Sequence, residues 1–257
     1  MSNKVVVFDL DGTLLNSRNE IIGGAQTLKC LSSLKKMGCA LAICTGRLDH
    51  DIIRVDTQYN LDIHHRISQN GAVVSKENKY NAILLDKEEA MDIYLYIENK
   101  DIRIELNTVS NRYWKTERDP DFPKELYDSH IIRENYEEII VCQPTVLFLL
   151  IGEERELDEI EKYVNSKYKN TKAVKTSKTS LEILHKKASK GNAIETLYPG
   201  YEVYAIGDSP NDFDMFPIVK QGYLVSDIDC PYRHIKSKSI LESLQDIISC
   251  VKYSKWR

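Results

Sequence analysis

The stretch that decides the fold lies near the start of the chain and reads Val5-Val6-Val7-Phe8-Asp9-Leu10-Asp11-Gly12-Thr13-Leu14-Leu15. Its first four residues are large and apolar without alternation, a pattern that predicts a strand buried on both faces, as in a parallel sheet. The apolar run ends abruptly in two carboxylates and a glycine. Because ligands of parallel sheets bind beyond the carboxyl ends of the strands, we expect Asp9 and Asp11 to lie in a ligand site.

The two carboxylates imply a cation. Asp9 and Asp11 are two residues apart, so in an extended chain their side chains point to the same side. Their mutual repulsion raises the pKa of one carboxyl or requires a cation, and a hard divalent ion such as Mg²⁺ takes oxygen ligands. The alternative is a β-hairpin, because Asp-Gly also favours a two-residue turn. Residues 14–20 do not alternate, which argues against a second paired strand.

The composition excludes several classes of protein. The chain has 257 residues, 42% of them hydrophobic, enough to bury the core of one large or two small domains. A formal net charge of -4 gives no global basic field for nucleic acid or membrane, and nine lysines between residues 161 and 190 are interpreted as a solvated surface. The six cysteines form no CxxC pair, and no signal peptide or membrane span is recognised. We therefore expect a cytoplasmic protein with no nucleic-acid or membrane partner.

A second strand end carries a candidate anion site. Apolar residues repeat every three positions over 21–37 and stop at Gly38, which predicts an amphipathic helix that ends at a glycine. The apolar run 39–44 then completes a strand-helix-strand unit of the kind that builds parallel sheets. It ends in Thr45-Gly46-Arg47, just before a predicted helix over 49–58. The free N–H groups at a helix start favour an anion.

The middle of the chain has a different pattern without chemical motifs. The predicted elements are helices over 87–99 and 153–168, and strands over 102–108, 112–116, 145–151, 172–176 and 180–185. Helices and hairpins in this order form an α+β layer, unlike the strand-helix-strand opening. The sequence therefore predicts an inserted domain of residues 81–185 within a core made of residues 1–80 and 186–257.

A lysine stands at an unfavourable place after the inserted segment. Ser189 is a good N-cap, so Lys190 becomes the first helical residue, at the end where the helix dipole disfavours a cation. A solvated surface lysine is the simple interpretation. A locally unfavourable charge can also mark a functional residue.

A second acidic cluster follows the predicted strand 201–206 and reads Gly207-Asp208-Ser209-Pro210-Asn211-Asp212. Ser209 as N-cap, Pro210 at the first helical position and Asp212 form a capping box, which explains these three residues structurally. Asp208 and Asn211 are left without such an explanation. Acids, a hydroxyl, backbone donors and one amine are thus expected at neighbouring strand ends, the set that phosphoryl transfer through an aspartyl intermediate requires.

The motifs together resemble those of the haloacid dehalogenase-like superfamily of phosphatases, specifically the Cof-type group with a C2 (IIB) cap. The matching segments are Asp9-Leu10-Asp11-Gly12-Thr13, Thr45-Gly46-Arg47, Gln69-Asn70-Gly71-Ala72, Ser189-Lys190-Gly191 and Gly207-Asp208-Ser209-Pro210-Asn211-Asp212. The resemblance extends over the whole chain. It implies an α/β fold with a Rossmann-like, doubly wound parallel-sheet core and an inserted α+β cap domain.

The resemblance also implies a role for each matched residue. Asp9 would be the nucleophile and a Mg²⁺ ligand, and Asp11 would be the general acid/base that binds Mg²⁺ through its main-chain carbonyl. Asp208 would complete the protein's metal ligands, with Asp212 in a supporting or weaker metal role. The residues implied for the phosphate group are Leu10 through its main chain, Thr45, Gly46, Arg47, Lys190 and Asn211.

The resulting expectation is a Mg²⁺-dependent phosphatase of small phosphorylated metabolites, with sugar phosphates favoured. A phosphomutase of the same fold would keep the same residues, and a non-catalytic phosphosugar-binding protein would be expected to lose Asp9 or Asp11. In the cap, the predicted hairpin around Arg112, Tyr113 and Trp114 is the candidate for substrate selection, although aromatic strand residues often belong to a core.

Overall fold

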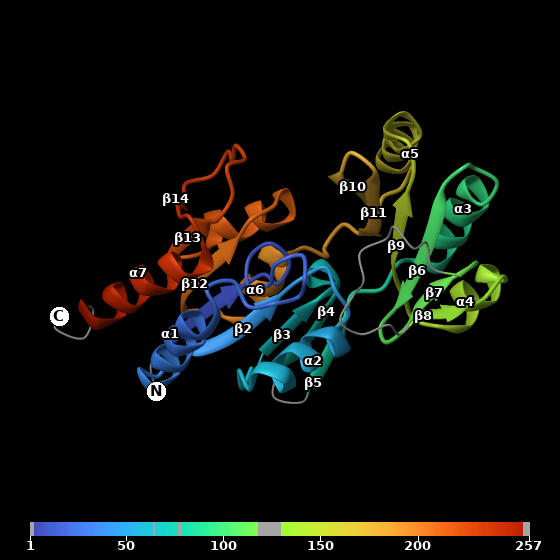
Figure 1. The fold of residues 1–257 in the computed structure, drawn as a ribbon. Coiled ribbons are helices and arrows are strands. Elements are labelled where there is room, and N and C mark those ends of the chain that lie inside the picture. Colours follow the sequence, from blue (N-terminus) through green and yellow to red (C-terminus); the bar gives the residue numbers. More distant parts are fainter. Residues whose placement is uncertain (1–2, 64, 77–78, 118–129, 254–257) are drawn as a thin grey trace. The chain divides into compact units, whose positions relative to one another are not determined.

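The computed structural model describes residues 3–63, 65–76, 79–117 and 130–253, which form two compact units (Figure 1). The core unit comprises Met1–Tyr80 and Ser189–Arg257, at the blue and red ends of the chain. The inserted unit comprises Asn81–Ala188. The chain thus leaves the core unit once and returns to it, so residues far apart in the sequence share one core.

The core unit is built on a sheet with the strand order β14-β13-β12-β1-β2-β3-β4-β5. The strands are β1 (Lys4–Phe8), β2 (Ala40–Cys44), β3 (His65–Ser68), β4 (Val73–Lys76), β5 (Lys79–Ala82), β12 (Glu202–Gly207), β13 (Gln221–Leu224) and β14 (Ile235–Lys236). Neighbouring strands from β14 through β3 are parallel, and β4 returns antiparallel to β3. This is the predicted doubly wound parallel sheet.

Strand β1 lies inside this sheet, as its sequence predicts. Val5, Val6, Val7 and Phe8 are fully buried, because parallel neighbours cover both edges and other elements cover both faces. Its partners are β12 and β2, so the alternative of an Asp-Gly hairpin after β1 is wrong.

The helices of the core unit follow the predicted order. They are α1 (Gly24–Lys36), α2 (Asp49–Tyr59), α6 (Lys190–Leu197) and α7 (Ile240–Tyr253), with 3₁₀ segments η1 (Gln69–Gly71) and η2 (Pro210–Ile218). Helix α1 begins three residues after the predicted start at residue 21, behind Gly23 in the left-handed region at φ 76°. Helix α6 packs against η2, which brings Lys190 close to the segment that follows β12.

The inserted unit has its own sheet, in the order β10-β11-β9-β6-β7-β8. Its strands are β6 (Arg103–Thr108), β7 (Arg112–Trp114), β8 (His130–Ile132), β9 (Thr145–Ile151), β10 (Thr171–Ser177) and β11 (Ser180–His185). Among the described strands of this sheet, β7 and β8 are parallel and the other neighbours are antiparallel. Its helices are α3 (Lys87–Ile97), α4 (Tyr136–Cys142) and α5 (Glu154–Lys167). The sequence did not predict the short elements β8 and α4 of this unit, or the short strands β5 and β14 of the core sheet.

The two faces of the inserted sheet differ in chemistry. Ile104, Leu106 and Tyr113 belong to a hydrophobic cluster with residues of α3, α4 and α5. The intervening residues of the same strands include Glu105 and Arg112, which are buried and bonded to each other. Successive strand residues alternate between faces, so β6 and β7 present an apolar face to the helices and a polar face away from them.

Within the described parts of the chain, no helix combines the length and the hydropathy that a membrane span needs.

Candidate active site

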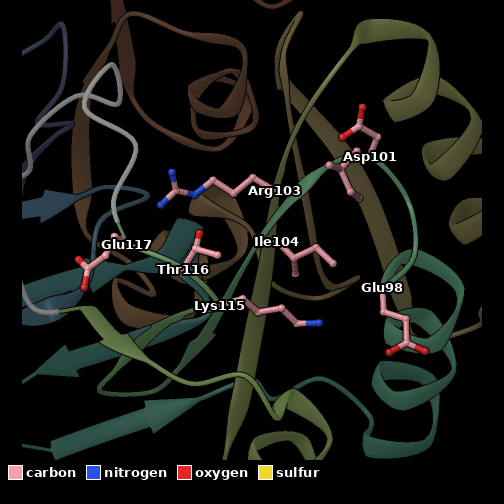
Figure 2. Close-up of a pocket in the computed structure, with 8 residues that line it drawn as sticks. Glu98, Asp101, Arg103, Ile104, Lys115, Thr116 and Glu117 are labelled. Atoms are coloured by element: carbon pink, nitrogen blue, oxygen red, sulfur yellow. The ribbon is translucent and has the colours of Figure 1, made fainter.

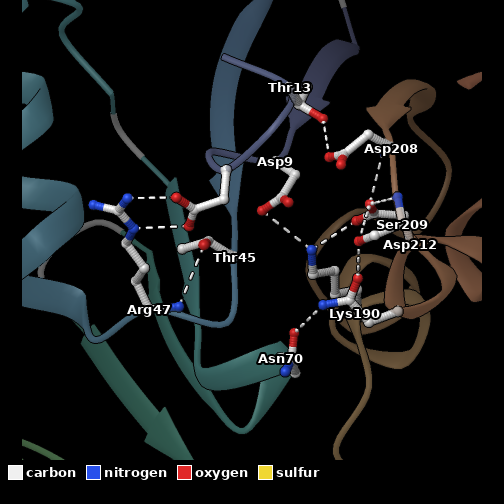
Figure 3. A network of polar contacts seen from close by, with 11 residues as sticks. Asp9, Thr13, Thr45, Arg47, Asn70, Lys190, Asp208, Ser209 and Asp212 are labelled. Atoms are coloured by element: carbon white, nitrogen blue, oxygen red, sulfur yellow. Dashed lines mark hydrogen bonds and ion pairs between the residues drawn. The ribbon is translucent and has the colours of Figure 1, made fainter. Parts of the chain in front are cut away.

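Three neighbouring strands of the core unit deliver the predicted residues to one edge of the sheet. Strands β12, β1 and β2 are adjacent and parallel, and Asp208, Asp9 and Thr45 directly follow them. Helix α6 begins at the same edge with Lys190, and Figure 3 shows these side chains pointing toward one another. This edge is where a doubly wound sheet binds its ligands.

Lys190 connects two of the acids. Its side chain is fully buried, and its Nζ lies 3.2 Å from Asp9 Oδ1 and donates to Asp212 Oδ1 at 2.6 Å. Burial alone would lower the pKa of Lys190, but the adjacent Asp212 and Asp9 carboxylates outweigh it and hold the pKa well above its usual range. Burial raises the pKa of Asp9, and Lys190 opposes that rise. The unfavourable position of Lys190 at the helix start is therefore offset by tertiary ion pairs.

Asp212 already uses both of its carboxylate oxygens. Oδ1 accepts from Lys190, and Oδ2 accepts from the backbone N–H groups of Asp208 at 2.9 Å and Ser209 at 3.0 Å. The predicted capping box of η2 is present, with Ser209 as the N-cap. Asp212 therefore orients both Lys190 and the loop that carries Asp208.

The acids can hold a divalent cation. One carboxylate oxygen each of Asp9, Asp208 and Asp212 lies within 4.8 Å of the others. Burial raises the pKa of Asp208 to about 6, although Thr13 Oγ1 donates to its Oδ1 at 2.7 Å. Buried carboxylates that repel one another fit a hard cation with oxygen ligands, which would neutralise them. Both Asp212 oxygens already accept hydrogen bonds from the protein, which favours Asp9 and Asp208 as the stronger ligands of such a cation.

Gly12 allows the loop after β1 to lie close to Asp208. Gly12 adopts φ +73°, and a Cβ at this position would lie 2.3 Å from Asp208 Oδ2. Any other residue would therefore meet both backbone strain and a collision with the cluster. The Asp-Gly pair that suggests a hairpin in the sequence serves instead to bring the β1 loop against Asp208.

Asp11 lies outside the acidic cluster. Its carboxylate, with a side chain 56% exposed, accepts from Arg47 Nε at 2.8 Å and from Arg47 Nη2. Arg47 Nη2 also donates to Asn19 Oδ1 at 2.8 Å. Arg47 was predicted to bind phosphate, and the structure places its guanidinium on Asp11 and Asn19. Asn19 was not singled out in the sequence, where no motif distinguishes it.

The remaining predicted phosphate-binding residues line the same edge. Leu10 is fully buried and Thr45 is 1% exposed, with its Oγ1 accepting from the Arg47 N–H at 3.3 Å. Asn211 Nδ2 donates to Asn70 Oδ1 at 3.1 Å. Asn70 lies in Gln69–Ala72, one of the segments that resemble the family, and the sequence predicts no individual role for it.

A pocket of 440 Å³ lies elsewhere, in the inserted unit (Figure 2). Strands β6 and β7 pair only as far as Glu105 opposite Trp114, and the pocket lies where the chain beyond Trp114 separates from β6. Its charged lining residues are Glu98, Asp101, Arg103, Lys115 and Glu117. The pocket contains none of the predicted catalytic or metal-binding residues, so it is distinct from the candidate active site.

Comparison with known proteins identifies the family. The sequence model of the family described as haloacid dehalogenase-like hydrolase matches residues 6–229. The chain belongs to the haloacid dehalogenase-like hydrolases.

Two proteins of similar sequence are phosphatases by name. Phosphatase YwpJ of Bacillus subtilis is 25% identical over 258 residues, covering 85% of this chain and 88% of its own. The 5-amino-6-(5-phospho-D-ribitylamino)uracil phosphatase YwtE of the same organism is 26% identical over 248 residues, covering 84% and 85%. A Thermotoga maritima crystal structure matches with a TM-score of 0.75 at 24% identity, covering 96% and 97%. The chain is therefore a phosphatase of the haloacid dehalogenase-like hydrolases, and the predicted family and fold class are confirmed.

Proposed function

We propose that this phosphatase hydrolyses small phosphorylated metabolites, sugar phosphates above all, with Mg²⁺ and through a phosphorylated Asp9. The observation that carries the proposal is the buried Lys190 between Asp9 and Asp212, beside Asp208. An ammonium that touches a nucleophilic carboxylate is placed to neutralise phosphoryl oxygens as they approach. A purely structural buried ion pair would not require a third acid next to it.

In the proposed reaction Asp9 and Asp11 divide the work. The Asp9 carboxylate attacks phosphorus, the ester P–O bond breaks, and Asp11 gives its proton to the leaving alcohol. Asp11 then takes a proton from water as the water attacks phosphorus, the bond to Asp9 breaks, and phosphate leaves. Asp9, Asp208 and the Asp11 main-chain carbonyl would hold Mg²⁺, with support from Asp212, and the ion would neutralise negative charge on these groups and on the phosphate.

The phosphate group is proposed to be held by Lys190, by Thr45 and Asn211, and by the main chain of Leu10 and Gly46. All of them belong to the core unit: Leu10 follows β1, Thr45 and Gly46 follow β2, Lys190 begins α6, and Asn211 follows β12. Arg47 remains a proposed phosphate-binding residue. Its bond to Asp11 means that the phosphate oxygens and the Asp11 carboxylate would compete for the same guanidinium.

Two kinds of support favour sugar phosphates. The relative YwtE is named for a substrate with a phosphorylated ribityl chain, and one solved structure of the same fold is described as a subclass IIB sugar phosphatase. In the inserted unit, Arg112 Nε and Trp114 Nε1 both donate to the Glu105 carboxylate at 2.8 Å. A polar sheet face that contains charged, amide and aromatic side chains suits hydroxyl-rich ligands, and we propose that this unit selects the leaving group.

The test is phosphate release from a panel of phosphorylated metabolites with and without Mg²⁺. Asp9→Asn should abolish turnover, because an amide can neither attack phosphorus nor bind the metal as an anion. The matched control is Asp229→Asn, a substitution of the same kind at an exposed position of the core unit, which should leave the rate unchanged. Wild-type phosphate release by Asp9→Asn would contradict the proposal, and transfer of phosphate within the substrate without its release would favour a phosphomutase.

A further inference from the structure

The turn between β3 and β4 has an unusual backbone. Gln69, Asn70 and Gly71 all adopt positive φ angles, of 49°, 52° and 86°. Asparagine tolerates this region and glycine adopts it freely, but a glutamine there is uncommon. Gln69 is fully buried and Asn70 is 5% exposed. A buried run of left-handed residues persists only where its surroundings hold it, and such runs cluster at functional sites.

The turn is bonded to the loop after β2. The Gln69 N–H donates to the Arg47 carbonyl at 2.9 Å, and the Asn70 N–H donates to the Thr45 carbonyl at 3.0 Å. The Asn70 side chain packs on Gly46, where a Cβ would lie 3.3 Å from Asn70 Nδ2. The turn thus fixes the backbone of residues 45–47, which is proposed to bind phosphate, through hydrogen bonds and packing.

The same turn lies against the start of α6. A Cβ on Gly71 would come within 2.1 Å of the Ser189 carbonyl oxygen and 3.1 Å of the Lys190 nitrogen. Only a glycine permits this contact, and its φ of 86° requires one as well. The turn therefore touches a second segment of the proposed phosphate site.

The third attachment is a side-chain hydrogen bond to Asn211. Asn70 Oδ1 accepts from Asn211 Nδ2 at 3.1 Å, and Ser209 Oγ donates to Asn211 Oδ1 (Figure 3 shows Asn70 and Ser209 on either side of this network). Asn70 selects the orientation of the Asn211 carboxamide, because with Asn70 oriented as in the structure a flipped Asn211 would place its own oxygen against Asn70 Oδ1. The bond to Asn70 uses one of the two hydrogens on Asn211 Nδ2, so the second hydrogen can bond to another acceptor.

We propose that Asn70 is a positioning residue for phosphate binding that acts through Asn211, by directing the second N–H of the Asn211 amide to a phosphoryl oxygen. The inference rests on the proposed function, in which Asn211 contacts the phosphate group. It assigns a role to a segment, Gln69–Gly71, that joins the Thr45–Arg47 loop, the start of α6 and Asn211 in one buried turn.

The experiment compares Asn70→Gly with wild type by inhibition with inorganic phosphate and by hydrolysis of 4-nitrophenyl phosphate. Glycine keeps the left-handed backbone and removes only the amide side chain. We expect the inhibition constant of phosphate and the KM to rise roughly tenfold, the usual effect of one lost orienting hydrogen bond, with kcat little changed. Partial misfolding would give the opposite split, because fewer active molecules lower kcat and leave the inhibition constant unchanged.

Two further variants make the test specific. Asn60→Gly is the matched control, since Asn60 is also left-handed, at φ 50°, but is exposed at the C-cap of α2, and it should leave phosphate inhibition unchanged. In an Asn211→Ala background, Asn70→Gly should have less than about a twofold further effect, because Asn70 acts through Asn211.

A tenfold effect that persists in the Asn211→Ala background would overturn the inference and show that Asn70 acts independently. So would an Asn70→Gly enzyme with the wild-type inhibition constant, which would leave the proposed function intact. A wild-type protein that is not inhibited by phosphate and releases none would instead overturn the proposed function and this inference together.

Discussion

Lys190 illustrates how tertiary contacts at the residue scale outweigh a local preference. It is the first residue of α6, where the helix dipole disfavours a positive charge, and it is fully buried. Both penalties are offset by Asp9 and Asp212, which lie within 3.2 Å. With Asp208 close by, three acids then face one ammonium, so the cluster keeps an excess of negative charge without a bound cation. The repulsion between these acids lowers the free energy of unfolding of the metal-free protein.

The first residue-scale prediction concerns Asp208 and pH. The pKa of its carboxyl is raised to about 6, so between its ordinary value near 3.8 and about 6 the folded state binds more protons than the unfolded state. The protonated Asp208 carboxyl therefore contributes its full stabilisation of the fold below pH 3.8, and this stabilisation is lost as the pH rises through 6 and the carboxyl ionises. An asparagine at this position stays neutral at every pH, so Asp208→Asn avoids the loss, and its amide oxygen can still accept the hydrogen bond from Thr13.

We therefore expect metal-free Asp208→Asn to unfold at pH 7 at a temperature roughly 2–4 °C above that of wild type, the shift that about 1 kcal/mol produces in a chain of this size. Added Mg²⁺ should raise the unfolding temperature of wild type and not of the variant. Thermal unfolding at pH 4 and pH 7, with and without Mg²⁺, measures both effects. Equal stabilisation of both proteins by Mg²⁺ would mean that Asp208 is not a metal ligand.

The second residue-scale prediction concerns Asp11, which Arg47 holds outside the acidic cluster. Asp11→Asn should slow both formation and breakdown of the phosphoenzyme, since it removes proton transfer and keeps the main-chain carbonyl. We expect a loss of rate of roughly 10²-fold or more, measured as kcat at saturating Mg²⁺. A normal saturated rate with a collapsed Mg²⁺ affinity would show that the Asp11 side chain is a ligand and not an acid/base.

At the scale of the element, the three consecutive side chains of strand β7 face different sides of the sheet. Tyr113 faces the helices, where it is 4% exposed, and its hydroxyl donates to Gln143 Oε1 at 2.7 Å. Arg112 and Trp114 bond to Glu105 on the opposite face, and the Arg103 guanidinium lies 4.3 Å from the Trp114 ring centre. The three residues were grouped as one candidate for substrate selection, and the structure separates Tyr113 from the other two.

The prediction for this element follows from that separation. Arg112→Ala and Trp114→Ala should raise KM for the best sugar phosphate and leave hydrolysis of 4-nitrophenyl phosphate nearly unchanged. All three substitutions remove buried side chains and should lower the free energy of unfolding in urea, by about 3–5 kcal/mol for Tyr113→Ala. Tyr113→Ala should differ in leaving the ratio of the two KM values unchanged, because its side chain faces the helices. Equal losses on both substrates for Arg112→Ala and Trp114→Ala would mean that this sheet face does not discriminate between leaving groups.

At the scale of the whole molecule, each unit contains a hydrophobic cluster of its own. One cluster includes Phe148 and lies entirely within Asn81–Ala188, and another includes Phe216 and is formed by residues before Tyr80 and after Ser189. Contacts of this kind define units that open separately in hydrogen exchange. The long insertion is therefore expected to have a stability that is partly independent of the catalytic sheet.

Phe148→Leu and Phe216→Leu test this independence as a matched pair. Each removes part of a buried ring at a cost of about 1 kcal/mol, which corresponds to roughly fivefold faster local opening. Hydrogen exchange followed by mass spectrometry should show faster exchange only in the unit that carries the substitution. Acceleration of both units by either variant would indicate that they unfold as one cooperative body.

The sequence by itself determined the family, the parallel core and the residues that gather at its edge, and the reasons are local. An uninterrupted apolar run predicts β1, because a strand covered on both faces requires it, and the capping signals at Ser189 and Ser209 predict the helix starts that follow. Strand ends of a parallel sheet meet at one edge, so the motifs predicted that Asp9 and Asp208 lie at the same edge, and the structure added that their strands β1 and β12 are direct neighbours.

Only the tertiary structure decided which hydrogen-bond partner each polar side chain has. The bond of Arg47 to Asp11 and that of Asn70 to Asn211 join residues 36 and 141 positions apart, and no local pattern encodes such distances. The short strand β8 was missed for the same reason. Helix α4 was missed although it has a local signal, since Asn135 caps it by accepting a hydrogen bond from the Glu138 N–H. The helix is held by Tyr136, whose hydroxyl hydrogen is shared between the carbonyl oxygens of Tyr113 at 2.7 Å and Ile104 at 3.0 Å on the neighbouring strands. Elements of this length depend on packing, because their own hydrogen bonds cannot offset the entropy of ordering them.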